Sequence, residues 1–193
     1  MRQIESKKDI EKRRRKNQII IGAILIIVML GSTFGYAISS LNKDNSGDNK
    51  LDYRGYKFVE QNGFWGTTIG NYDFLFRYNP TQVESMEIEG DLNYLTSYSG
   101  KPLYVFSEDY VAEVEIYRNL GNIVQRFQGA CPEGTNCTED WPVKDCSNNF
   151  IIIKKANESR IYQEQNCAFI EGNAENLTQI TDEFLFKITG IES

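Results

Sequence analysis

Residues 19–38 form a run of twenty with no charged side chain, and Arg13, Arg14, Arg15 and Lys16 stand just before it. In a helix that rises ~1.5 Å per residue, such a run spans ~30 Å, the thickness of the hydrocarbon core of a bilayer. The run therefore predicts a single N-terminal transmembrane helix. It constrains topology and compartment more than any other feature of the chain.

The charges on the two sides of this run differ in sign. Residues 1–18 carry eight Lys or Arg against three acids, a net of +5, whereas residues 39–193 carry 13 basic and 24 acidic side chains, a net of −11. Because basic residues near a span stay on the cytoplasmic side, residues 1–18 are predicted to be a cytoplasmic basic head. The rest of the chain would then lie outside a cell membrane that it crosses once.

A cleaved signal peptide is the alternative, since Ala37-Ile38-Ser39 offers a small-x-small cleavage pattern. Cleaved signals have an apolar core of roughly 7–15 residues, which is shorter than this run, so an uncleaved signal-anchor is favoured. Residues 39–50 contain one apolar residue among turn formers and charges, and we expect a flexible tether there. Residues 51–193 are long enough for one extracytoplasmic domain.

The start of this domain has the pattern of an antiparallel β-meander. Three aromatic-rich segments, 56–59, 64–69 and 72–78, are separated by Asn62-Gly63 and Gly70-Asn71. Asn-Gly supplies the positive φ values of a tight hairpin turn. Pro80 favours a short helix over residues 81–86, and residues 103–106 are predicted to be a strand.

Two long helices are predicted further along the chain. Apolar residues recur at helical spacing over 108–127, where Ser107 is placed to cap the start, and again from Leu177 to Ile191, where Gly190 marks the stop. Residues 150–154 and 160–162 are predicted to be strands of a hairpin. The expected fold is α+β, with a mainly antiparallel sheet covered by the two long helices.

The four cysteines, Cys131, Cys137, Cys146 and Cys167, all follow the apolar run, and an even number outside the membrane predicts two disulfides. A zinc site is the alternative, but no C-x-x-C spacing occurs. In a hairpin centred between residues 156 and 157, Cys146 would face Cys167. Cys131–Cys137 then follows by elimination.

Three N-x-S/T sequons lie on the same side of the run, at Asn136, Asn157 and Asn176. They are candidate glycosylation sites. Asn157 falls in the predicted hairpin tip, whereas Asn176 is also placed to cap the last helix.

Few residues offer recognisable chemistry. The chain has no histidine, which excludes Ser-His-Asp and Cys-His nucleophiles, and it has no P-loop or G-x-G-x-x-G motif. An acidic cluster at Glu84, Glu87, Glu89 and Asp91 lacks the glycine and glutamate positions of an EF-hand and is typical of a solvated turn. We therefore predict no catalytic, cofactor-binding or metal site, and the acidic domain argues against a nucleic-acid partner.

The aromatic residues offer two interpretations. Tyr72, Phe74, Phe76 and Tyr78 alternate along one strand and so share a face. The face is expected to lie in the core, against Val114, Tyr117, Phe184 and Ile188 of the two helices. An exposed stacking platform for sugars or peptides is the alternative.

Gly31 and Gly35 in the apolar run match G-x-x-x-G, the pattern of a homodimer contact between transmembrane helices. The motifs identify no protein family. The leading functional hypothesis is a membrane-anchored domain that binds a protein partner at the membrane surface or serves as an accessory subunit of a membrane complex. An anchored hydrolase using carboxylates or a Ser-Lys dyad is the alternative.

Overall fold

The structure is a computed structural model that describes residues 49–83 and 88–191. They belong to one compact unit, Asp48–Ser193. The predicted basic head and transmembrane run, with residues 39–48 of the predicted tether, lie outside the described residues. Lys50, placed in the tether, is instead the first residue of a strand.

The meander forms a sheet of its own. Its four antiparallel strands follow the chain order: β1 (Lys50–Tyr53), β2 (Tyr56–Gln61), β3 (Phe64–Ile69) and β4 (Tyr72–Phe76). Asn62 and Gly63, with φ of 54° and 77°, make the β2–β3 turn, as their sequence predicts. The sequence pattern does not predict β1, which pairs with β2 across the turn at Arg54 and Gly55.

A second, six-stranded sheet has the order β5-β11-β12-β10-β6-β7. Its strands are β5 (Ile88–Glu89), β6 (Pro102–Ser107), β7 (Arg126–Gly129), β10 (Phe150–Lys155), β11 (Arg160–Glu164) and β12 (Cys167–Gly172). Every pairing is parallel except that of β11 with β12. The short strands β8 (Cys131–Pro132) and β9 (Val143–Lys144) pair separately.

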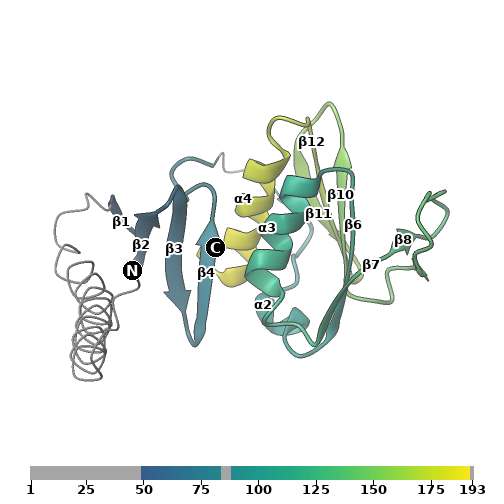
Figure 1. Ribbon diagram of the computed structural model, residues 1–193, viewed down its shortest axis with the longest axis horizontal. Coiled ribbons are helices and arrows are strands. Elements are labelled where there is room, and N and C mark those ends of the chain that lie inside the picture. Colours follow the sequence, from purple (N-terminus) through teal and green to yellow (C-terminus); the bar gives the residue numbers. More distant parts are fainter. Residues whose placement is uncertain (1–48, 84–87, 192–193) are drawn as a thin grey trace, which may run out of the picture. The chain divides into compact units, whose positions relative to one another are not determined.

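Two helices lie between the sheets. α3 (Tyr110–Leu120) contacts β4 and β6, and α4 (Leu177–Thr189) contacts β11, β12 and α3 (Figure 1). α2 (Leu95–Tyr98) is a single turn. The helices thus separate the meander from the six-stranded sheet. Gly190 ends α4 with φ of 80°, as predicted. The predicted cap of the preceding helix is wrong: the Asp109 side chain, not Ser107, caps α3 by accepting the Ala112 N–H.

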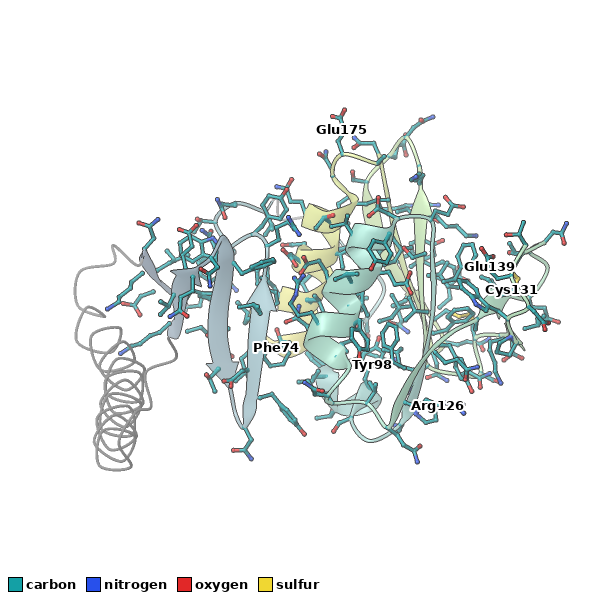
Figure 2. All side chains as sticks on the ribbon, viewed as in Figure 1. Phe74, Tyr98, Arg126, Cys131, Glu139 and Glu175 are labelled. Carbon is teal, nitrogen blue, oxygen red and sulfur yellow. A yellow bond between two sulfur atoms is a disulfide. The ribbon has the colours of Figure 1, made fainter. Side chains whose placement is uncertain are left out.

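Aromatic side chains join the meander to α4. Phe76 is fully buried, and its ring centre lies 4.5 Å from that of Phe186 and 6.1 Å from that of Phe74. Figure 2 shows Phe74 on the side of the meander that faces the helices. The predicted core face is therefore present at Phe74 and Phe76, but Tyr72 is 39% exposed.

The predicted fold class is wrong. Among the described residues the helices are short, of 4, 11 and 13 residues, none is long and apolar enough to cross a membrane, and the larger sheet is mostly parallel. The predicted helix over 108–127 stops at Leu120, and its last residues form β7. No helix appears over residues 81–83.

The buried face of α3 explains the error. Tyr117, predicted to face the core, is 58% exposed, and Tyr110 is 79% exposed, whereas Glu115 and Asn119 are buried. Hydropathy assigns such polar residues to solvent, and only their partners in the fold make their burial favourable.

The predicted hairpin of 150–154 with 160–162 is also absent. β10 pairs with β6 and β12, and β12 separates it from β11. Residues 150–153 are all buried because both faces of this strand are covered. A local turn cannot reveal a parallel partner that comes later in the chain.

Phe76→Ala is expected to lower the free energy of unfolding by ~3–5 kcal/mol, because it leaves a cavity between two packed layers. Tyr72→Ala, at a partly exposed ring of the same strand, should cost much less. Chemical denaturation of both variants measures the difference. Equal losses would contradict the assignment of this core.

Candidate functional site

All four cysteines are paired, as Cys131–Cys137 and Cys146–Cys167. The predicted pairing is confirmed, but the register on which it rests is wrong. Cys167 begins β12 opposite Phe150, and Cys146 lies in the loop before β10, where its carbonyl accepts a hydrogen bond from the Asn166 N–H at 3.1 Å. The paired thiols cannot act as nucleophiles or zinc ligands. Two disulfides fit a secreted or extracytoplasmic domain.

The three sequon asparagines are exposed. Asn136 lies in the loop closed by the disulfide of Cys131 (Figure 2), and Asn157 lies between β10 and β11. Asn176 occupies the N-cap position of α4, but its side chain makes no capping bond. The Asn173 side chain accepts the N–H of Asn176 instead. Glycosylation stays a prediction at all three.

The remaining sequence candidates lie wholly or partly outside the described residues. Gly31, Gly35, Glu84 and Glu87 are outside them. Glu89 pairs with Tyr162 through the backbone of β5 and β11. The structure therefore does not test the interpretation of this cluster as a solvated turn.

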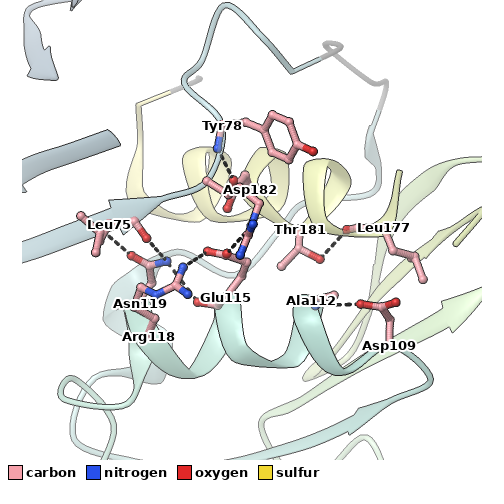
Figure 3. A network of polar contacts seen from close by, with 11 residues as sticks. Leu75, Tyr78, Asp109, Ala112, Glu115, Arg118, Asn119, Leu177, Thr181 and Asp182 are labelled. Atoms are coloured by element: carbon pink, nitrogen blue, oxygen red, sulfur yellow. Dashed lines mark hydrogen bonds and ion pairs between the residues drawn. The ribbon is translucent and has the colours of Figure 1, made fainter. Parts of the chain in front are cut away.

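Buried carboxyl groups sit between α3 and α4 (Figure 3). The Glu115 side chain is fully buried and accepts hydrogen bonds from Arg118, at 2.6 Å, and from Arg77, at 3.4 Å. Burial raises the pKa of Asp182 well above its ordinary value, and the Glu115 charge raises it further, against the hydrogen bonds from the Tyr78 and Arg77 N–H groups and the Arg118 charge. Because neither Asp182 nor Glu115 is exposed, this carboxyl pair has no access to a substrate.

These polar groups instead complete the edge of β4. The Asn119 amide accepts a hydrogen bond from the Leu75 N–H at 2.8 Å and donates one to the Leu75 carbonyl at 3.1 Å. It thereby replaces a neighbouring strand. The Asp182 carboxyl accepts the Tyr78 N–H at 2.8 Å, one step along the same edge. The network is structural, and it holds β4 in position.

On the other face of the meander, away from the helices, lies a groove of about 490 Å³. We call it the meander groove. Its lining residues come from β2, β3 and β4: Lys57, Val59, Gln61, Gly66, Thr67, Thr68, Asp73, Phe74 and Leu75. The ring of Phe74 is buried in the core, and its carbonyl lies on the groove side beside Gly66. This volume is in the range of small ligand sites, ~300–1,000 Å³, and it also suits the side chains of a protein partner.

Gly66 opens the groove, and the fold does not require a glycine there. Its φ is not positive, and an added Cβ would meet nothing closer than 3.6 Å, the Leu75 Cδ1. A glycine inside a strand weakens the strand and often marks the close approach of a ligand or another backbone. The missing side chain leaves the sheet surface open at this point of the groove.

The groove combines an apolar floor with polar ends. Val59 and Leu75 are the cross-strand neighbours of Gly66, and Leu75 is 37% exposed. Lys57 and Asp73 supply charges of opposite sign, and Asp73 accepts a hydrogen bond from the Thr68 hydroxyl at 2.7 Å. Such a surface can hold a protruding apolar side chain while its polar rim pairs with neighbouring polar groups.

The sequence pattern does not predict this groove, because it identifies 64–69 only as a strand. The one available signal is Gly66 itself, a glycine within an aromatic and β-branched run.

Compared with protein-family models, with curated proteins and with solved structures, the chain shows no significant match to any of them.

Replacing the buried carboxyl group tests its protonation. Folded Asp182 keeps a proton that the unfolded chain releases at a lower pH, so wild-type stability should fall as the pH rises from about 4 toward the raised pKa. Asp182→Asn should therefore gain stability relative to wild type as the pH rises from 4 to 7. Denaturation curves across this range measure the trend.

Asp145→Asn is the contrasting variant. Hydrogen bonds from the Ser147 side chain and backbone lower the pKa of Asp145, so its contribution to stability is lost as the pH falls. Relative to wild type, Asp145→Asn should lose stability as the pH rises to about 4, and the difference should stay constant between pH 4 and 7. A parallel profile for wild type and Asp182→Asn would show that Asp182 is ionised in the fold.

Proposed function

We propose that this protein is a membrane-anchored extracytoplasmic domain that holds a protein partner through the meander groove. Residues 19–38 supply the anchor and residues 1–18 the cytoplasmic head. The +5 charge of that head, the −11 charge of residues 39–193 and the two disulfides support this arrangement.

The groove at Gly66 is the observation that carries the proposal. It lies on a sheet face that the helices do not cover, and the Asn119 amide fixes the wall at Leu75. A prepositioned wall lowers the entropy that binding must overcome. The partner is a protein surface that presents a branched or aromatic apolar side chain beside charged groups.

Hydrolysis has less support than binding. The disulfides occupy the thiols, the chain has no histidine, and the carboxyl pair of Glu115 and Asp182 is buried. The meander groove instead pairs an apolar floor with a polar rim, which is the composition of a contact surface.

Anchoring would make a modest interface sufficient. Two proteins confined to one membrane meet at a high effective concentration, so a weak contact is populated without extensive buried area. A shallow groove on one sheet therefore suits an accessory subunit that stays beside its partner.

Protease added to intact cells or spheroplasts is expected to remove residues 51–193 and to leave the head protected. The positive head and the disulfide-bearing domain are the reasons. Antibodies against tags at the two ends of the chain read the result. A domain protected until the membrane is permeabilised would contradict the proposed topology.

Gly66→Val should fill the groove and reduce partner binding about tenfold, which is ~1.4 kcal/mol. The fold should stay intact or become slightly more stable, because valine favours strands. A photoreactive residue at Gln61, on the rim, would report the partner as a crosslinked adduct in membranes. The adduct should weaken in the Gly66→Val chain.

Lys155→Val is the matched control, since it adds a β-branched side chain at an exposed strand residue of the other sheet. It should leave the adduct unchanged. Undiminished crosslinking in Gly66→Val would exclude the groove as the contact.

A further inference from the structure

The two edges of the meander sheet differ in whether the rest of the fold satisfies their backbone groups. Asn119 and Asp182 satisfy the backbone of β4, as described above. At the opposite edge, no strand of the described residues pairs with β1 on the side away from β2. An open strand edge is a template for pairing with another chain.

The register shows which groups of β1 face outward. The Asn49 carbonyl accepts a hydrogen bond from the Glu60 N–H at 2.9 Å, and Tyr53 faces Tyr56 across a two-residue turn. Since backbone groups alternate along an antiparallel strand, Leu51 also bonds to β2. Lys50 and Asp52 therefore direct their N–H and carbonyl groups to the open edge.

The side chains of this edge are complementary to themselves. Lys50 and Asp52 are exposed and lie two residues apart, so they share one face, whereas Leu51 packs against the core from the other. Charges at a short edge strand commonly discourage pairing. Opposite charges at this spacing do the reverse when a second copy runs antiparallel, because each then faces the other sign.

We propose that β1 pairs with β1 of a second copy of this chain, with Leu51 facing the partner's Leu51. Lys50 would then face the partner's Asp52, and Asp52 the partner's Lys50. Each of these pairs would exchange both backbone hydrogen bonds and form an ion pair on the outer face. The two meander sheets would join into one continuous sheet that carries both grooves.

This contact is small. Stable interfaces bury about 1,200–2,000 Å², more than two four-residue strands provide, and exposed ion pairs contribute only ~0–1 kcal/mol. Its strength in the cell rests on the proposed anchor, which would concentrate the copies in one plane. The pairing geometry itself depends only on β1.

Leu51→Cys in the full-length chain tests the pairing. All native cysteines are bonded, so the new thiol is the only free one. In the proposed register the two Leu51 residues form a pair without mutual hydrogen bonds, with Cα atoms about 4.5 Å apart, close enough for a disulfide. Mild oxidation of membranes should yield a disulfide-linked dimer on non-reducing gels, whereas Glu175→Cys, in the loop before α4, should not.

A charge exchange in the Leu51→Cys chain supplies the specificity. Lys50→Asp alone or Asp52→Lys alone places like charges opposite each other and should lower the dimer yield about tenfold. The double variant Lys50→Asp with Asp52→Lys restores opposite charges and should restore the yield. A yield of disulfide-linked dimer that is the same in the single and double charge variants would overturn the proposal.

Two further measurements distinguish β1 pairing from a dimer held together elsewhere in the chain. The double substitution Gly31→Leu with Gly35→Leu, in the same Leu51→Cys chain, should not change the dimer yield. A loss of the dimer would show that contacts in the apolar run produce it, and would count against β1 pairing. In the unsubstituted chain, carbodiimide should couple Lys50 to Asp52 between isotopically light and heavy copies. Absence of that mixed peptide would also overturn the proposal. It is the result expected where other residues of the chain cover the edge of β1.

The proposed membrane anchor and the proposed β1 pairing can be tested separately. The protease experiment tests the anchor alone. If the chain is not in the membrane, the same crosslinking at high protein concentration in solution still tests β1 pairing, and a charge-sensitive dimer there would support it without the anchor.

Discussion

The rest of the structure depends on the burial of α3 and α4 between two sheets. α4 is buried along most of its length, and α3 is buried along one face. Each polar residue on these buried faces must find a partner within the fold. Thr181 donates to the Leu177 carbonyl at 2.7 Å, and Glu183 pairs with Lys187 at 3.0 Å. Asp182 and Asn119 find theirs on the edge of β4.

This arrangement links the interior to the outer surface of the meander. The side chains that satisfy the helices also fix Leu75, a wall of the groove, and close one edge of the sheet. The meander groove at Gly66 and the open edge of β1 belong to this same sheet. The features on which both proposals rest therefore belong to the N-terminal sheet, and the helices hold that sheet in place.

Local signals in the sequence predicted local structure well. Asn62-Gly63 defined a turn because two adjacent residues with positive φ suit few other dipeptides. Gly190 ended α4 for a similar reason. The disulfide pairs were predicted correctly on a wrong register: Cys146 was expected opposite Cys167 in a hairpin, with Cys131–Cys137 left by elimination, whereas Cys167 faces Phe150 in the sheet.

By itself, the sequence determined the turn between β2 and β3, the end of α4 and the charge asymmetry, each of which depends on neighbouring residues or on the charges summed over a segment. The tertiary structure alone decided the parallel sheet, the buried face of α3 and the groove. Residues 150–153 are buried on both faces because alternate side chains enter two different clusters: Ile151 and Ile153 pack in the core with the helices, and Phe150 and Ile152 pack with Tyr104 and Cys167. Glu115 and Asn119 are buried with Arg118 and Leu75 as their hydrogen-bond partners. The residues that cover a buried strand lie far away in the chain, and buried polar residues have the hydropathy of exposed ones. Local periodicity therefore cannot reveal either.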